Sequence, residues 1–484
     1  MHTSYSQPNR TQSMEQSPST AKPPAIQDVL IGIFLLAVTV LVILSEWTSR
    51  TTWQGFAAIG VILFVVAAIP RVGWSRIAFA VAGFTLFIWA LITRPDWLAI
   101  TEAALSSAAF IAAFFTALTW LRNASASSTA IDVCGRFLAE QPPGRRYATL
   151  TVGAHLFSLI LNYGSIALLG NLAEASARRE PNGEIRGHST RRMLLAIQRG
   201  FVSTLPWSPL TFAVAISTSL VPGASWADAL GYCVVSALIL AGIGWALDTV
   251  FKPRLSIPSS PRPKPNGTWA CLLPLLALLT LLVLTVGALH IATGIRAVGV
   301  VMVVVPIISA CWLALQNFGD RPIARTLSRT AQYLVRDLPG YRSELFLLTM
   351  AGFIGTLGAK LVSPIFAASG YDLTVFPGWL ILVALVWLIP ITGQIGMNPI
   401  LSVSLIAPLL PKASAMGVTP AAVTTALTAG WALSAASSPF AATTMLVGNI
   451  ARVSAWHIGL VWNGAYTALS ALMLSAWVAF IASL

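Results

Sequence analysis

The chain has 484 residues, of which 56% are hydrophobic and 9% are charged, and its formal net charge is +13. So apolar a composition excludes a water-soluble globular protein and indicates a polytopic membrane protein. The basic residues lie almost wholly in short loops between apolar stretches, so positive-inside topology explains them and nucleic-acid binding is not indicated. The four cysteines show no paired spacing, which supports neither a disulfide framework nor a zinc site.

The apolar stretches predict an all-α membrane protein. Residues 1–25 are polar, and we expect them to form a disordered cytoplasmic tail before the first membrane helix. Windows of about 20 apolar residues then predict eleven transmembrane helices, at 27–46, 54–70, 77–93, 98–121, 193–221, 228–247, 269–289, 296–315, 344–362, 420–451 and 457–480.

Two further apolar stretches are predicted to be re-entrant hairpins. Residues 147–172 have clusters of arginine on both sides, and short Lys/Arg-rich loops stay in the cytoplasm, so we expect this stretch to enter and leave by the cytoplasmic face. Residues 376–411 have only Lys412 as a positive charge in their flanks, so both ends are expected outside. Two hairpins of opposite orientation are what a secondary transporter with an inverted repeat needs.

Charge asymmetry sets the expected topology in the cell membrane, with the N-terminus cytoplasmic and the C-terminus external. The predicted cytoplasmic segments hold most of the Lys and Arg, whereas the external loops 222–227, 290–295 and 363–375 contain none. We expect the first membrane helix and the first repeat in 26–251, a cytoplasmic linker in 252–267 and the second repeat in 268–484. Segment 318–343 alternates apolar and arginine residues at near-helical spacing, which predicts an interfacial helix on the cytoplasmic surface.

Each predicted half has an asparagine near the middle of its hairpin, followed by a long span with a Ser-Pro pair. Proline removes a backbone donor and clashes with the preceding turn, so each long span should split into two half-helices. Lipid cannot solvate the freed backbone groups, which makes the breaks candidate sites. The candidates for substrate or ion binding are Asn162, Gly164, Ser165, Ser208, Pro209, Thr211, Gly396, Asn398, Pro399, Ser438, Pro439 and Thr443.

Other interpretations of these residues stay open. The glycine, serine and proline residues also suit close helix packing and ordinary kinks. A third Ser-Pro pair, at Ser363 and Pro364, follows a glycine at the same spacing as the other two pairs, so the spacing alone does not identify a site, and this pair is expected in an external loop. His155, in the first hairpin arm, either relays protons or only bonds a neighbouring carbonyl. Glu102 is expected to reach water at the outer surface.

The predicted midplane lacks carboxylates, which disfavours a multi-carboxylate proton antiporter or a metal-cation site. Half-helix N-termini and side-chain amides suit an anion, while unwound carbonyls and hydroxyls suit Na⁺.

The strings GQIGMNPILSVSLIAPLLP and AGWALSAASSPFAATT, together with the two-hairpin layout, resemble the ion transporter superfamily. That group includes divalent anion/sodium symporters, citrate carriers, arsenite permeases and sodium/proton antiporters. The resemblance covers the general plan of roughly residues 50–480, and its local motifs are specific only in the second half. In the divalent anion symporters both hairpin tips carry Ser-Asn-Thr, but here Asn162 and Asn398 lack those neighbours, so dicarboxylate specificity does not carry over. The resemblance implies a homodimer with an elevator-like motion.

The sequence therefore predicts a secondary active transporter for a small solute, with an anion favoured, coupled to Na⁺ or H⁺. We expect no catalytic residues, no bound metal and no cofactor apart from coupling Na⁺. The expected partners are the solute, the lipid bilayer and a second copy of the chain. The alternatives are a cation/proton antiporter or metalloid efflux permease, a membrane-embedded lipid or glycan enzyme, and a non-transporting scaffold. The long loops contain neither paired carboxylates with histidine nor a nucleophile arrangement, which disfavours the enzyme.

Overall fold

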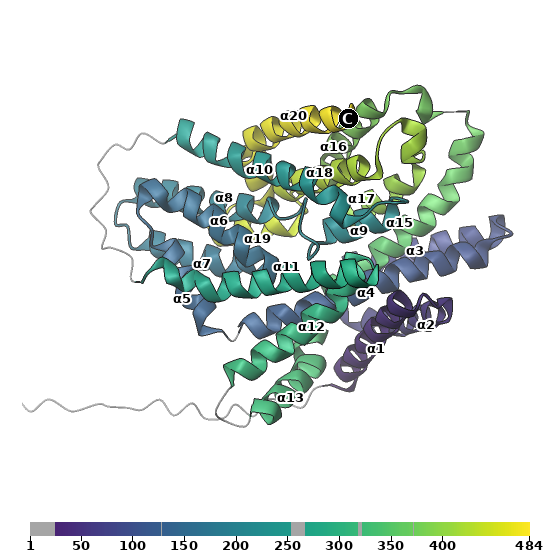
Figure 1. Cartoon of the computed structure of the whole chain (residues 1–484), viewed down its shortest axis with the longest axis horizontal. Helices are drawn as coiled ribbons and strands as arrows, with labels where there is room; N and C mark the ends of the chain where they lie inside the picture. Colours follow the sequence, from purple (N-terminus) through teal and green to yellow (C-terminus); the bar gives the residue numbers. More distant parts are fainter. Residues whose placement is uncertain (1–24, 127, 253–266, 318–321, 371) are drawn as a thin grey trace, which may run out of the picture.

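The computed structural model describes residues 25–484 except 127, 253–266, 318–321 and 371. Residues 1–24 of the expected tail at 1–25 and residues 253–266 of the expected linker at 252–267 lie outside this part. Throughout the described part, the regular elements are helices (Figure 1). This confirms the all-α class.

Nine helices in the described part are long and apolar enough to cross a membrane. They correspond to nine of the eleven expected spans and are α1 (Ile26–Thr48), α2 (Thr51–Ala68), α3 (Trp74–Thr93), α4 (Trp97–Ala126), α10 (Trp226–Val250), α11 (Leu273–Thr293), α12 (Ala297–Gln316), α15 (Arg342–Ala368) and α20 (Gly464–Ile481). The other two expected spans are interrupted, as their Ser-Pro pairs predict. The first divides into α8 (Gly183–Val202) and α9 (Phe212–Leu220), and the second into α18 (Pro420–Ser437) and α19 (Ala442–Ala451).

Both expected hairpin stretches fold back on themselves. The first consists of α6 (Pro143–Leu161) and α7 (Gly164–Arg178), and its two ends meet where Arg179 donates a hydrogen bond of 3.0 Å to the carboxylate of Glu140. The second consists of α16 (Gly378–Gln394) and α17 (Pro399–Ile406). Its base is closed, because a Cβ atom placed on Gly378 would lie 2.3 Å from the carbonyl oxygen of Met416. Re-entry of these hairpins into a membrane stays a prediction.

The first hairpin is longer than the apolar stretch at 147–172 that indicated it. Its helices continue into the charged flanks, where Glu174 and Arg178 form an ion pair at i,i+4 spacing on α7. Such pairs stabilise a solvated helix end that apolar periodicity alone does not detect.

The half-helices pack in a reciprocal way across the two halves of the chain. The first-half helix α7 contacts α19, and α17 of the second half contacts α9. Likewise α8 contacts α19, and α18 contacts α9. This exchange has the form that a pair of symmetry-related repeats would produce, and the inverted repeat itself stays a prediction.

The expected external loop at Pro364 is not observed, because α15 continues through this proline to Ala368. Pro306 and Pro390 also lie inside helices, in α12 and α16. A proline near the end of a helix removes only one backbone bond, and the later residues of α15 still close the last turn, where the amide of Ser369 bonds the carbonyl of Ile365. Proline alone therefore does not decide where a span breaks.

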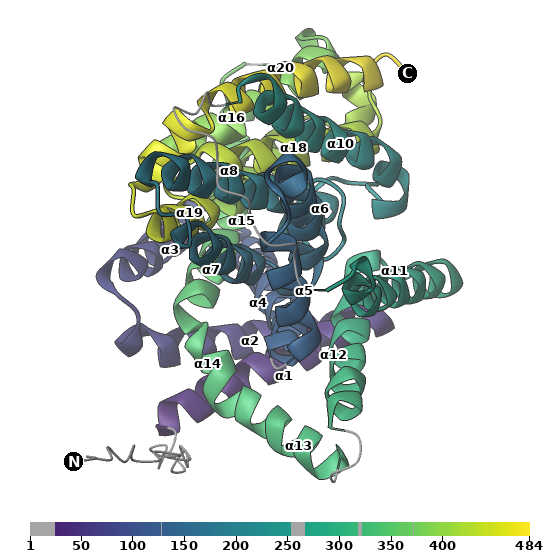
Figure 2. The same cartoon turned by 90° about the vertical axis from the view of Figure 1, so that its left-hand side faces the viewer.

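Besides one-turn elements such as α14 (Leu338–Gly340), the described part has two more helices. Helix α5 (Thr129–Ala139) packs against both arms of the first hairpin, and α13 (Pro322–Gln332) follows α12. Figure 2 shows α13 at the opposite end of the molecule from α20. Ile323 and Leu327 of α13 are 75% and 64% exposed. An unburied apolar face on a helix rich in arginine is what the predicted interfacial helix requires.

Candidate functional site

The tip of the second hairpin packs directly on the break in the second long span. The Ser438 hydroxyl donates a hydrogen bond of 2.7 Å to the Gly393 carbonyl oxygen, and the Gln394 side-chain amide donates one of 3.2 Å to the Ser437 hydroxyl. A Cβ atom on Gly393 would lie only 2.4 Å from Oγ of Ser434. This close approach therefore requires glycine.

Two helices, α17 and α19, begin within a few residues of this contact. Asn398 caps α17, because its side-chain oxygen accepts a hydrogen bond of 2.9 Å from the amide of Ile400, and Pro399 fills the first helical position. The Asn398 amide nitrogen makes no hydrogen bond with the residues that the structure describes. Helix α19 starts without a side-chain cap, and a Cβ on Gly396 would lie 3.9 Å from the Phe440 ring. Both positive helix ends are thus available to a negatively charged group.

The tip of the first hairpin holds a strained backbone at Asn162. Its φ of 50° and ψ of −131° are unusual for a residue with a side chain, and such conformations cost about 1–3 kcal/mol. The carbonyl of Asn162 accepts hydrogen bonds from the amide and the hydroxyl of Ser165, at 3.0 and 2.7 Å. Ser165 also bonds the hydroxyl of Ser158 at 2.7 Å. The half-exposed side chain of Asn162 makes no hydrogen bond in the described part of the chain.

The first hairpin also packs against the first broken helix, at the end of α8 and the start of the first break, residues 203–211. The Tyr163 ring stacks on Phe201 with centroids 5.0 Å apart. Nδ1 of His155 lies 2.8 Å from the hydroxyl oxygen of Ser203, and that hydroxyl donates to the carbonyl of Gly200. The Nδ1 atom of His155 thus has a hydroxyl rather than a carbonyl as its partner. A role in proton relay stays a prediction.

Hydroxyl groups at both breaks bond backbone carbonyls that the interrupted helices release. Thr211 donates to the carbonyls of Ser208 and Leu205, at 2.8 and 3.1 Å. In the second break, Thr444 donates to the carbonyl of Ser438 at 2.6 Å, and Thr443 to that of Ala435. These bonds explain how the breaks are tolerated. A hydroxyl that donates in this way keeps lone pairs for a cation.

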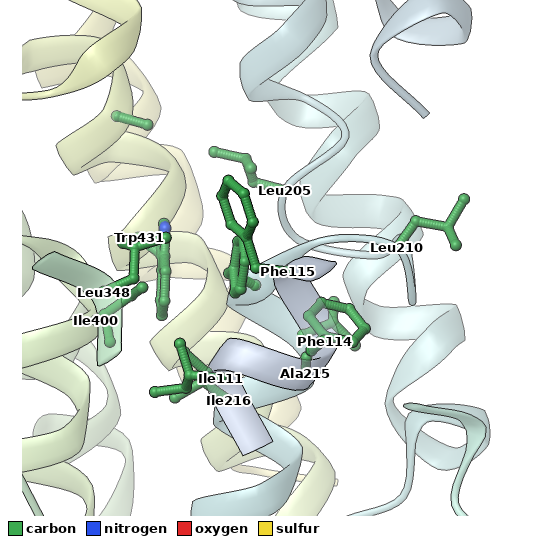
Figure 3. Close-up of a cluster of buried hydrophobic side chains, with 14 of the residues drawn as sticks. Ile111, Phe114, Phe115, Leu205, Leu210, Ala215, Ile216, Leu348, Ile400 and Trp431 are labelled. Atoms are coloured by element: carbon green, nitrogen blue, oxygen red, sulfur yellow. The ribbon is translucent and has the colours of Figure 1, made fainter. Parts of the chain in front are cut away.

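The first break and its half-helix lie in the apolar centre of the molecule. Figure 3 shows Leu205 and Leu210 of the break near Phe114 and Phe115 of α4, with Trp431 of α18 on the other side. The rings of Phe114 and Phe212 meet edge to face, 5.3 Å apart. In each half, the hairpin thus packs against the broken helix. Helix α9 of the first half also contacts α17 and α18, and helix α19 of the second half contacts α7 and α8.

A buried polar network joins the two halves, and the sequence analysis did not detect it. Arg199 is only 5% exposed, and its guanidinium donates 3.1 Å hydrogen bonds to the Asn463 side-chain oxygen and the Tyr147 hydroxyl. It also lies 4.5 Å from the centre of the Tyr466 ring. Asn463 in turn donates to the side-chain oxygen of Gln198 at 3.0 Å. The sequence does contain one signal for this network, because Arg199 lies inside an expected membrane span. Charged residues inside such spans are rare and usually have a functional role.

A second arginine lies beside the first hairpin tip. A Cβ atom on Gly164 would lie 3.4 Å from Nε of Arg122, which belongs to α4. The Arg122 guanidinium also lies 4.9 Å from the centre of the Tyr341 ring. The sequence analysis used Arg122 only as evidence for topology. Its contact places a guanidinium beside the tip, and the carboxylate of Glu344 is close enough to interact electrostatically with both Arg122 and Tyr163.

Comparison with known proteins identifies a related fold but no family. No family model matches the chain, and no curated protein matches it. Among solved structures, it is similar to the YdaH transporter of Alcanivorax borkumensis, whose crystal structure is described as revealing an unusual topology. The two are 15% identical over 84% of this chain and 98% of that one, with a TM-score of 0.54.

A weaker similarity links the chain to MtrF of Neisseria gonorrhoeae, which is described as illuminating a class of antimetabolite efflux pumps. The two are 12% identical over 86% of this chain and 97% of that one, and their TM-score is 0.45. The comparison with YdaH shows that this chain shares the fold of a membrane transporter.

Proposed function

We propose that the protein is a secondary active transporter that carries a small solute across the cell membrane. The observation that supports this most is the contact between a hairpin tip and a broken helix, found once in each half of an apolar helical protein. Irregular backbone is tolerated at membrane depth only where protein or a watery cavity surrounds it, and transporters bind solutes and coupling ions at such places. The fold shared with YdaH supports the same function.

The solute in this proposal is an anion. The uncapped start of α19, the start of α17 and the free amide nitrogen of Asn398 all present positive or donor groups at the second tip. Arg122 places a guanidinium at the first tip, where its charge is shared with the nearby Glu344 carboxylate. Negatively charged groups are favoured at helix N-termini and beside a guanidinium.

The remaining parts of the proposal concern coupling and assembly. Carbonyls at the second break, with the hydroxyls of Ser438 and Thr443, are the proposed Na⁺ ligands, and His155 is the proposed proton carrier if H⁺ drives transport. Membership of the ion transporter superfamily, symport by a homodimer, a cytoplasmic N-terminus and an external C-terminus belong to the same proposal. Cation/proton antiport is the alternative function.

Counterflow in proteoliposomes tests the function. Vesicles preloaded with a panel of carboxylates and inorganic anions should accumulate the labelled form of at least one of them, faster with an inward Na⁺ or H⁺ gradient. Movement of a cation against protons, with no anion transported, would instead establish antiport. Absence of any flux from folded protein would refute a transporter.

Two conservative variants test whether the side chains at the hairpin tips are needed for transport. Asn398→Ser keeps an N-cap for Ile400 but removes the amide nitrogen, and Asn162→Gly keeps the positive φ but removes the side chain. Both should melt within a few degrees of the parent yet lose most of the transport. Normal transport by both variants would place the solute elsewhere.

A further inference from the structure

A cavity of about 740 Å³ lies where α5, α12 and α13 meet, at the end of α12 that charge asymmetry predicts to be cytoplasmic. Figure 2 shows α12 and α13 together at one edge of the molecule. One wall of the cavity is a single face of α13, because its lining residues there are spaced i, i+3, i+4 and i+7, namely Arg325, Ser328, Arg329 and Gln332. The rest of the wall comes from the first residues of α5 and the last residues of α12. None of the lining residues belongs to a hairpin tip or a break.

The two arginines of this face lie within reach of one phosphate group. Residues four apart on a helix have Cβ atoms about 5–6 Å apart, and Arg325 and Arg329 line the same cavity. A guanidinium has five N–H donors, so each arginine can bond a protein group and a phosphate oxygen at the same time. Arginine is the residue that most often recognises phosphate through paired hydrogen bonds. The face of α13 thus has the donors that a phosphate requires.

The charge of the cavity is positive. Among the described residues that line it there are two arginines and no carboxylate. Asp337 interacts electrostatically with Arg329 but does not line the cavity, and Asp132 of α5 is held by Arg136 in an ion pair of 2.8 Å. Segment 318–343 contains five arginines and two aspartates, so its net charge stays positive. The N-terminus of α5, the positive end of its dipole, also borders the cavity, which therefore attracts anions.

The basic cavity continues into apolar surface. Leu315 of α12 lines it and is 69% exposed. A second cavity, of about 60 Å³, shares Ser128, Ala130 and Trp312 with the first. Its remaining wall carries apolar side chains and two thiols, from α5, α6, α11 and the turn before α11. A molecule that fits both parts has an anionic group joined to a hydrocarbon chain.

We propose that this cavity binds an anionic phospholipid of the cytoplasmic leaflet. The headgroup phosphate lies between Arg325 and Arg329, and the start of an acyl chain lies along Leu315 and Trp312. Basic pockets between membrane helices on the cytoplasmic side suit such headgroups, whereas a soluble phosphate would make no use of the apolar part. The bound lipid holds α13, which has exposed apolar residues, at the membrane surface. The site is separate from the hairpin site and does not depend on which solute is transported.

Thermal unfolding of the purified, delipidated full-length protein in detergent tests the proposal. Phosphatidylglycerol is titrated into the micelles and compared with zwitterionic phosphatidylcholine that has the same acyl chains. Inorganic phosphate and glycerol 3-phosphate are titrated separately at constant ionic strength. Phosphatidylglycerol should raise Tm in a saturable way, because a ligand that binds the folded state stabilises it, and the other three should not. Combining Arg325→Gln with Arg329→Gln should raise the half-maximal concentration of phosphatidylglycerol about tenfold, because the charged hydrogen bonds to the phosphate are lost.

Two further variants separate the cavity from general effects of charge. Arg178→Gln combined with Arg179→Gln removes two exposed arginines at the end of α7, on the same expected side of the membrane, and should respond as the parent does. Ser328→Glu keeps both cavity arginines but places a carboxylate on the same face of α13. Because Ser328 is exposed, the fold should tolerate this change, and the response to phosphatidylglycerol should weaken.

The outcomes distinguish the lipid from other occupants. Equal stabilisation by phosphatidylcholine would mean that any bilayer lipid suffices, and equal stabilisation by a soluble phosphate would mean that the ligand is not a lipid. Either result would overturn the proposal, as would no response to phosphatidylglycerol or a parent-like response from both cavity variants. A dimer that forms without phosphatidylglycerol and dissociates in Ser328→Glu would show instead that a second copy of the chain covers the cavity.

Discussion

The hydroxyl of Ser438 donates a hydrogen bond of 2.7 Å to the backbone carbonyl oxygen of Gly393, and this bond joins the second helix break to the second hairpin tip. The same hydroxyl accepts a hydrogen bond of 3.1 Å from the amide of Phe440. Ser438 is only 2% exposed, so water does not substitute for either partner. One short side chain thus fixes the conformation of the break and its position against the tip.

Ser438→Ala is expected to destabilise the protein by about 1–3 kcal/mol, because it removes the acceptor of the Phe440 amide and leaves the Gly393 carbonyl with only the 3.4 Å hydrogen bond from the amide of Gly396. Thermal or denaturant unfolding in detergent measures the change. Ser483→Ala is the matched control, since that exposed hydroxyl bonds only a carbonyl of its own helix end. An equal, small effect of both variants would show that the bond contributes nothing to the fold.

Gly393→Ala should be poorly tolerated, because the new Cβ would lie 2.4 Å from Oγ of Ser434 and 3.2 Å from Cβ of Ser438. We expect a lower Tm and separation of the tip from the break. Gly231→Ala, in α10, is the control, since a Cβ there meets no atom within 4 Å. Alanine at a helical glycine stabilises by up to about 1 kcal/mol. Similar Tm changes for the two variants would contradict the packing described for the tip.

Labelling of introduced cysteines tests the opposite orientation of the two halves. Gly187→Cys on α8 and Ser369→Cys after α15 are both at exposed positions. The background must carry Cys311→Ser, because Cys311 is exposed. In intact cells, a membrane-impermeant thiol reagent should label position 369 only, and it should label position 187 only after the membrane is opened. Labelling of both positions from one side would exclude the predicted topology.

Arg199 and Asn463 are expected to be energetically coupled, because they bond each other inside the fold at 3.1 Å. In a double-mutant cycle with Arg199→Leu and Asn463→Leu, the coupling energy should be about 0.5–3 kcal/mol. The cycle of Arg199→Leu with Ser483→Ala should instead be additive within about 0.5 kcal/mol. Additivity in both cycles would mean that the network does not join the two halves.

Local rules in the sequence located most helices and both hairpins. A membrane helix needs about 20 apolar residues, and basic loops stay on one side, so α1 to α4 and the hairpins around Asn162 and Asn398 could be placed from composition alone. Proline also predicted the breaks before α9 and α19. The continuous helix at Pro364 shows the limit of this rule. A break persists where other groups bond the freed carbonyls, as Thr444 does for Ser438.

The sequence by itself thus determined the membrane class, the positions of the apolar helices and the residues most able to interrupt them, because these depend on burial in lipid and on local backbone chemistry. Only the tertiary structure decided which of these residues meet. The contact of Ser438 with Gly393, the bond of Arg199 to Asn463 and the cavity beside Ser128 and Arg329 join residues far apart in the chain. Such contacts depend on which helix faces pack together, and in a chain this uniformly apolar the hydrophobic pattern does not distinguish one face from another.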